Sequence, residues 1–172
     1  MADEQYERDI EASRAETRGS FENRALIYYY LFDELAAEIG RERAADVMKR
    51  AIKRRGLEVG KKYREAAESG DLEAVGRIFC EGSPCGGALF QPGVESSEGE
   101  RIVLHMAACP LVDAWRGLGL APDEIDLLCE ISAAVDFGTF ESAGLELEFL
   151  DRAGKAGSTR CVLQLDRKRG YR

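Results

Sequence analysis

The sequence predicts an α+β domain in which N-terminal helices pack on a small antiparallel sheet, with further helices between two hairpins. The first half, to about residue 81, repeats its apolar residues at helical spacing. Residues 94–109 are predicted to form a hairpin around Ser97–Gly99, and residues 145–166 alternate apolar and polar residues around a Gly-containing turn. Between these hairpins, Pro110 and Pro122 each mark the start of a helix. We divide the chain of 172 residues into a polar N-terminal lead, 1–19, and a single α+β domain, 20–172.

The first helix is predicted from Ser20, as N-cap, to Ile39, with Gly40 as its stop. Residues 1–19 are expected to be frayed or weakly helical. One stripe at helical spacing predicts the buried face: Tyr28, Leu31, Phe32, Leu35 and Ile39. Ile27 and Tyr30 fall outside this stripe, so we expect a second covered face, as in a homodimer.

A second long helix is predicted over about residues 41–68, and a shorter helix follows Asp71 as its cap. The apolar face of the long helix is Ala45, Met48, Ile52, Gly56, Val59, Tyr63 and Ala66. Gly56 and Gly60 lie one turn apart at a cost in helix stability, which indicates a close contact there with another helix or a ligand. The last hairpin is predicted to pair residues 145–153 with 158–166.

Composition excludes several classes of protein. Apolar residues make up 45% and charged residues 33% of the chain, and the net charge is −8, which disfavours nucleic-acid binding. No apolar run is long enough to span a membrane, and the N-terminus lacks a signal-peptide core, so we expect a cytoplasmic protein without a membrane partner. Five cysteines in such a chain predict free thiols rather than a disulfide framework.

Four segments, taken in order, resemble a known family: "NRALIYYYLFDELAAEIG", "MKRAIKRRGLEVGKKY", "CPLVDAWRGLGL" and "LLCEISAAVDFGTFE". Together, over residues 20–166, they are similar to the L-2-amino-thiazoline-4-carboxylic acid hydrolase family. The most specific part is the CPLVxAW segment followed by LCEI and Asp136-x-Gly138. The resemblance implies a hydrolase that opens a cyclic isothiourea, a thiazoline, to a carbamoyl-cysteine. The substrate is expected to be a small molecule with a C=N-containing heterocycle or a related amidine-like bond.

Two other interpretations stay open. The order of elements in the C-terminal half, with Cys161 in the last strand, also resembles 4-vinyl reductase-type domains. That likeness implies a small-molecule-binding or sensor domain without chemistry. The cysteines also allow a thiol-based metal-binding protein.

The expected catalytic residues are Cys109, Asp136 and Cys129. The family motif points to Cys109 as nucleophile or metal ligand, and so as the thiol on which function depends. Cys129 and Asp136 are seven residues apart, which places them on one helical face with Cα atoms about 10.5 Å apart. This spacing suits two sides of a pocket, with Asp136 as acid or base and Cys129 lining the pocket or supporting Cys109. For each of these residues, simple packing in the core is the alternative.

Whether a metal is bound is left open. His105, Cys109 and Cys129, with or without Asp136, have the residue types of a zinc site but not the paired CxxC spacing. On a strand, His105 and Cys109 would lie about 13 Å apart, so a direct dyad needs a bend between them.

Candidate substrate-binding residues are Trp115, His105, Arg54 and Arg55. Trp115 is either a packing residue or a stacking surface. The two arginines lie in a run, residues 49–64, with eight basic residues and one acid, which is either a solvated helix face or the source of an arginine that holds a substrate carboxylate. Cys80 and Cys85 match no family motif. They flank Gly82 and Pro84, which leaves only a redox pair as a candidate role.

Overall fold

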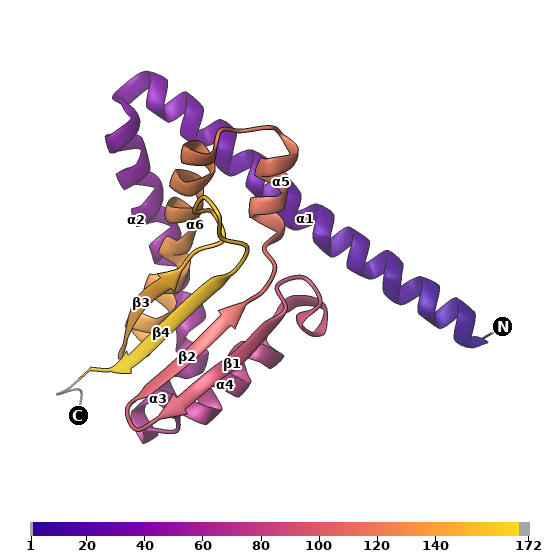
Figure 1. Cartoon of the computed structure of the whole chain (residues 1–172), viewed down its shortest axis with the longest axis vertical. Coiled ribbons are helices and arrows are strands. Elements are labelled where there is room, and N and C mark those ends of the chain that lie inside the picture. The colour runs from indigo at the N-terminus through magenta and orange to yellow at the C-terminus, as the bar shows by residue number, and fades with distance from the viewer. Residues whose placement is uncertain (1, 169–172) are drawn as a thin grey trace.

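The computed structural model describes residues 2–168, with side chains from residue 4, so expectations for residue 1 and for 169–172 lie outside it. Helices form the N-terminal half of the chain, and two further helices lie between the two β-hairpins (Figure 1). The helical elements are α1 (Ala2–Ile39), α2 (Arg41–Val59), η1 (Gly60–Tyr63), α3 (Arg64–Ser69), α4 (Leu72–Glu81), η2 (Pro84–Gly87), α5 (Pro110–Gly117) and α6 (Pro122–Ser142). The strands are β1 (Pro92–Glu98), β2 (Arg101–Met106), β3 (Leu145–Asp151) and β4 (Cys161–Arg167). The α+β fold class is confirmed.

The four strands form one antiparallel sheet in the order β1-β2-β4-β3, so the two predicted hairpins meet along β2 and β4. Leu104 lies opposite Leu163 and Ile102 lies opposite Leu165, and all four side chains are fully buried. Successive residues of a strand point to opposite faces, so this set defines the inner face of the sheet. Helices α4 and α6 cover that face, while the other face is open in the view of Figure 1.

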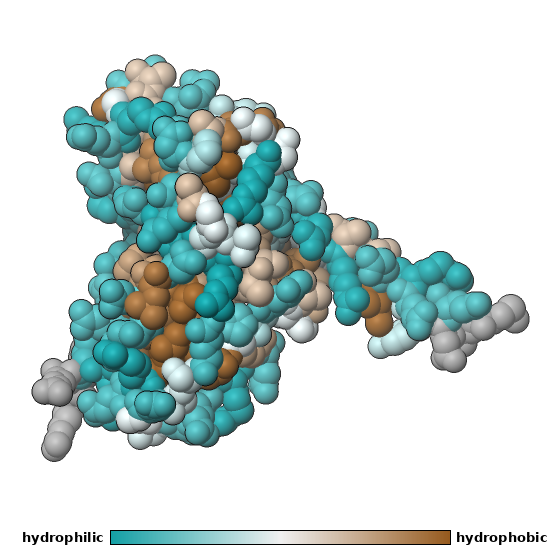
Figure 2. Space-filling view, viewed as in Figure 1, coloured by the Kyte–Doolittle hydropathy of each residue, from teal (hydrophilic) through white to brown (hydrophobic). Residues whose placement is uncertain are grey.

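Helix α1 differs from the sequence prediction. It runs unbroken from Ala2, and the Ser20 hydroxyl donates to the Glu16 carbonyl oxygen within the helix instead of capping its start. The first residues are good helix formers without a proline, and Gly19 alone does not break the helix. The C-terminal part packs on the domain: Phe32 is fully buried, but Leu31 is 51% exposed, contrary to the predicted stripe. The N-terminal part projects from the body, and its surface is mainly hydrophilic in Figure 2.

The predicted stop of α1 and the predicted starts of α4, α5 and α6 are confirmed. Helix α1 ends at Ile39 before Gly40, whose φ is 84°, in the left-handed region that suits glycine. The Asp71 carboxylate accepts from the Ala74 N–H at 2.8 Å and so caps α4. Pro110 and Pro122 are the first residues of α5 and α6. Across the described residues, none of the helices combines the length and apolar character needed to cross a bilayer.

Glycines bring α2 and η1 into direct contact with α6. A Cβ on Gly56 would collide with the Val135 carbonyl, and one on Gly138 would collide with the Lys53 carbonyl. Gly60 lies as closely against Thr139. The expected close contact at Gly56 and Gly60 is therefore with a helix rather than with a ligand. Because the backbones touch, α6 has a fixed position against α2, and its other face is turned toward the sheet.

Candidate functional site

A cavity of about 220 Å³ lies between α6, the sheet and the C-terminal half of α1. This is at the small end for ligand pockets, which commonly hold about 300–1,000 Å³. Its walls are mostly apolar and include Phe21, Phe79, Phe90, Met106 and Phe149. Phe21 and Phe90 meet edge to face with ring centroids 5.1 Å apart, which links α1 to the loop before β1. The cavity therefore has an apolar shell in which each polar group stands out.

Three thiols line this cavity: Cys109 just before α5, Cys129 on α6 and Cys161 at the start of β4. All three are free. Burial raises the pKa of the Cys109 thiol to about 11, although the nearby N–H groups of Leu111 and Val112 act in the opposite direction. Cys109 is the N-cap residue of α5, but its side chain forms no capping hydrogen bond. Burial also raises the pKa values of Cys129 and Cys161, so these thiols are protonated at neutral pH in the empty cavity.

Asp136 is the carboxyl group of the cavity. Cys129, Ser132, Ala133 and Asp136 line it from α6 at spacings of three and four residues, so one face of the helix supplies all of them. Within residues 4–168 no hydrogen bond or ion pair to the Asp136 carboxylate is found. Loss of water around it raises its pKa from 3.8 to about 7. Its side chain is half-buried and lines the cavity.

Tyr63 faces the same cavity from η1, and the sequence had indicated only a core position for it. Its ring is 4% exposed and packs against Phe140 at 5.4 Å between centroids. Burial and the neighbouring Asp136 carboxylate raise the pKa of the phenol, which therefore keeps its proton. Tyr63 can thus donate a hydrogen bond inside the cavity across the working pH range.

Two cations, Arg24 and Lys62, line the outer part of the cavity. Both side chains are exposed, and neither forms an ion pair within the described residues. The Arg24 guanidinium stacks over Phe21 at 4.6 Å, and the Lys62 ammonium lies 5.0 Å from the centre of the Tyr63 ring. They are notable in a chain with a net charge of −8. Sequence reasoning missed them because only the fold brings α1 and η1 together here.

The structure places the four expected substrate-binding residues outside the cavity. Trp115 is fully buried, and its indole N–H donates to the Ala25 carbonyl oxygen, so it has the packing role. Arg54 is exposed on α2, and Arg55 pairs with Glu58 at the surface. They have the surface role, because the inner face of α2 is occupied by α6.

His105 also lies outside the cavity, because it points to the other face of β2 from Met106. Its Nδ1 is buried and has no hydrogen-bond partner among the residues that the structure describes; it lies 3.6 Å from a Glu95 carboxylate oxygen. His105, Cys109 and Cys129 therefore do not converge, which corrects the candidate zinc ligand set. Within the part of the chain that the structure describes, no three His, Cys, Asp or Glu side chains gather as metal ligands.

The site thus combines a carboxyl group with a pKa near neutrality, a protonated phenol and three neutral thiols in an apolar cavity with cations at its edge. Cys80 and Cys85 do not belong to it. Such an arrangement can bind a small anionic molecule and move a proton to or from it.

Comparisons with known proteins identify a family for the chain. A search of curated proteins finds no match. The family model of L-2-amino-thiazoline-4-carboxylic acid hydrolase matches residues 20–163, which include all the polar cavity residues described above. The chain therefore belongs to the L-2-amino-thiazoline-4-carboxylic acid hydrolase family.

Proposed function

We propose that this protein is a small-molecule hydrolase that opens a C=N-containing heterocycle of the thiazoline type. One observation carries the proposal: the Asp136 carboxyl group has no ion-pair or hydrogen-bond partner among the described residues and lies in an apolar cavity, where its pKa is raised to about 7. A general base works best when its pKa is near the operating pH. The family name supplies the substrate class, a 2-amino-thiazoline that carries a carboxylate.

In the proposed reaction, Asp136 accepts a proton from a water molecule as the water oxygen bonds to C2 of the ring. The C2–S bond then breaks: the second water proton leaves the C2 hydroxyl for the ring nitrogen, which forms the C=O bond of the carbamoyl group, and the proton held by Asp136 passes to the departing sulfur. The Tyr63 hydroxyl donates a hydrogen bond to the ring nitrogen, on which electron density builds during the attack. One water is consumed, and the product is a thiol with a carbamoyl group.

The Cys109 thiol is not the nucleophile in this proposal, unlike in the sequence-based expectation. A thiolate is the reactive form, and burial raises the pKa of this thiol to about 11. The negative charge of Asp136 raises the pKa values of Cys129, Cys161 and Tyr63. We therefore assign Cys109 and Cys129 to the wall of the cavity and water to the attack.

The carboxylate of the substrate would lie at the edge of the cavity, against Arg24 and Lys62. A carboxylate between two unpaired cations keeps part of its hydration, so the apolar interior needs to hold only the uncharged ring. This orientation directs the ring toward Asp136.

The test is an assay of L-2-amino-thiazoline-4-carboxylate opening, with release of the thiol as readout. Asp136→Asn keeps the size of the side chain but removes the base, so the rate should fall about 10²–10⁴-fold. Asp46→Asn, a matched change at an exposed position of α2, should leave the rate unchanged. Full activity in Asp136→Asn would refute the proposal. Tight binding without turnover by the wild type would instead favour the sensor interpretation.

A further inference from the structure

A short segment after β3, Arg152–Gly154, lies directly behind two of the cavity thiols. The Ala153 N–H donates to the Cys161 sulfur at 3.4 Å. The next N–H, that of Gly154, is directed at the Cys129 sulfur and lowers the pKa of that thiol. A Cβ on Gly154 would lie 2.9 Å from the same sulfur, so only glycine allows this approach. Consecutive backbone donors therefore face two sulfur atoms from one side.

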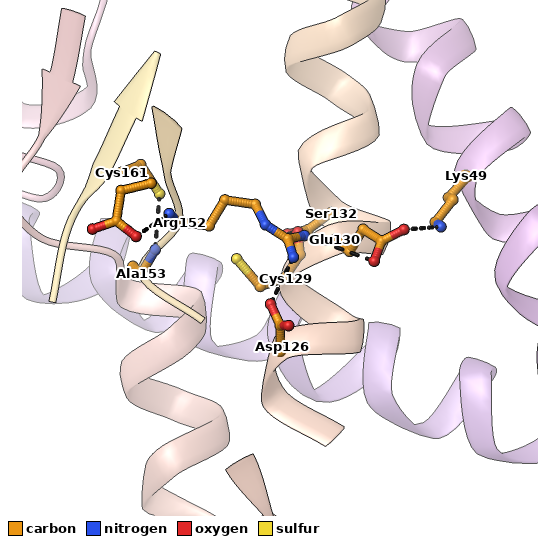
Figure 3. A network of polar contacts seen from close by, with 9 residues as sticks. Lys49, Asp126, Cys129, Glu130, Ser132, Arg152, Ala153 and Cys161 are labelled. Atoms are coloured by element: carbon orange, nitrogen blue, oxygen red, sulfur yellow. Dashed lines mark hydrogen bonds and ion pairs between the residues drawn. The ribbon is translucent and has the colours of Figure 1, made fainter. Parts of the chain in front are cut away.

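Arg152 connects this segment to the helices. Its side chain is 12% exposed, and one guanidinium nitrogen donates to Asp126 on α6 at 2.7 Å. A second guanidinium nitrogen lies 4.0 Å from Glu130, one turn further along α6, and Glu130 pairs with Lys49 of α2. Figure 3 shows this chain of contacts running from Lys49 through Glu130 and Arg152 toward the two thiols.

We propose that Arg152 is a positioning residue, which holds the Ala153 and Gly154 N–H groups against the Cys161 and Cys129 sulfur atoms. The consequence to be measured is how readily Cys129 loses its proton. The inference does not depend on the proposed function. It is open to test on the thiols themselves, whatever substrate the protein accepts.

The charges around Cys129 agree with this role. Asp126 and Asp136, both on α6, raise the pKa of its thiol, whereas Arg152 lowers it. The other two thiols, Cys109 from the start of α5 and Cys161 from β4, interact with Cys129 across the cavity. Arg152 is thus the one cation that acts on Cys129 within the described residues. Its loss would remove that charge and release the N–H groups.

The experiment measures the rate of alkylation of Cys129 by iodoacetamide as a function of pH, resolved for each cysteine by mass spectrometry. In Arg152→Gln, the pH midpoint for Cys129 should rise by about one unit, so the rate below the midpoint should fall about tenfold. Arg152→Lys should restore part of the shift, because it keeps the charge but not the planar, two-pronged geometry. Arg101→Gln, which breaks an ion pair with Asp166 elsewhere on the sheet, should leave the midpoint unchanged.

A variant that changes no charge separates the effect of the N–H position on Cys129 from the effect of the Arg152 charge. Gly154→Ala keeps the Arg152 ion pairs but pushes the N–H away from Cys129, so it should also raise the midpoint. It carries the test if Arg152→Gln does not fold. If iodoacetamide does not reach Cys129, the thiolate absorbance at about 240 nm, as the difference between wild type and Cys129→Ser, gives the same midpoint. An unchanged midpoint in folded Arg152→Gln or Gly154→Ala would overturn the inference, while a protein that turns over no thiazoline would refute only the proposed function.

Discussion

The indole N–H of Trp115 donates a hydrogen bond to the backbone carbonyl oxygen of Ala25 at 2.9 Å, across 90 residues of sequence. Both residues are fully buried. The bond joins α5 to α1 next to Arg24 and one turn from Phe21, and both of these residues line the cavity. The tryptophan of the family motif thus supports the wall of the site from behind.

Trp115→Phe should lower the free energy of unfolding by about 2–3 kcal/mol. The substitution removes the indole donor to the Ala25 carbonyl oxygen, which lies within helix α1, and opens a void where the larger ring was. Urea unfolding followed by circular dichroism measures the change. Tyr30→Phe on α1, where the side chain is 56% exposed, is the control and should unfold with the wild-type midpoint. Equal stability of Trp115→Phe and the wild type would contradict the role of this bond.

The stability of the wild type should depend on pH through Asp136. The folded protein binds the proton of this carboxyl more tightly, with a pKa of about 7, than the unfolded chain, with the ordinary value of 3.8. Stability contributed by the protonated group is therefore present below about pH 4 and is lost as pH rises to about 7. At about 1.4 kcal/mol per pKa unit, the loss is at most about 4 kcal/mol.

Asp136→Asn removes that dependence. Compared with the wild type, the variant should be similar in stability at about pH 4 and more stable at about pH 8. Urea unfolding at the two pH values measures the difference, in which the other titrating groups cancel. A variant that is less stable than the wild type at about pH 8 would show that Asp136 has a stabilising partner when it is ionised.

The rate of ring opening should rise with pH through a midpoint near 7. Only the ionised Asp136 carboxylate can accept the proton of water, and its pKa in the empty cavity is about 7. The pH profile of kcat/KM, which reports the free enzyme, measures this midpoint. A profile that rises only near pH 11 would assign the reaction to the Cys109 thiolate instead.

Cys109→Ser should retain most of the activity, with a loss of less than about tenfold. In the proposed reaction the thiol is a neutral part of the wall, and a hydroxyl group occupies nearly the same space. A nucleophile would show a loss on the order of 10³-fold or more. Steady-state rates, with the melting temperature as a check on folding, decide between the two roles.

Arg24→Gln should raise KM for the carboxylate substrate about tenfold, with a smaller effect on kcat. The interaction is made with a part of the substrate that does not react, so it contributes equally to the ground state and the transition state. Lys62→Gln should act in the same way. With 2-amino-thiazoline, which has no carboxylate, neither change should matter, and Arg54→Gln on the surface is the control.

Local signals in the sequence predicted most of the fold. Pro110, Pro122 and Asp71 mark helix starts through their own backbone chemistry, so their interpretation needs no tertiary information. The predicted start of α1 was wrong: Ser20 has the chemistry of a cap, but the residues before it continue the helix.

The site was predictable where its residues share one element. Cys129 and Asp136 occur on one helical face, and the structure places both at one cavity. Arg24, Tyr63 and Cys161 come from three different elements, and only tertiary packing brings them together. The surface positions of Arg54 and Arg55 could not be predicted either, because the charge pattern of α2 does not show which of its faces meets α6.

The glycines between α2 and α6 limit how this site can diverge. Gly56, Gly60 and Gly138 leave no room for even one added methyl group, so the helix that bears Asp136 cannot slide or rotate to suit a new ligand. Adaptation to other substrates must therefore come from the opposite wall, where Phe21 and Arg24 of α1 contact each other and Phe21 contacts Phe90 through side chains. The rigid wall formed by α6 therefore carries the proposed chemistry, and substitutions in the opposite wall can change which ligand binds.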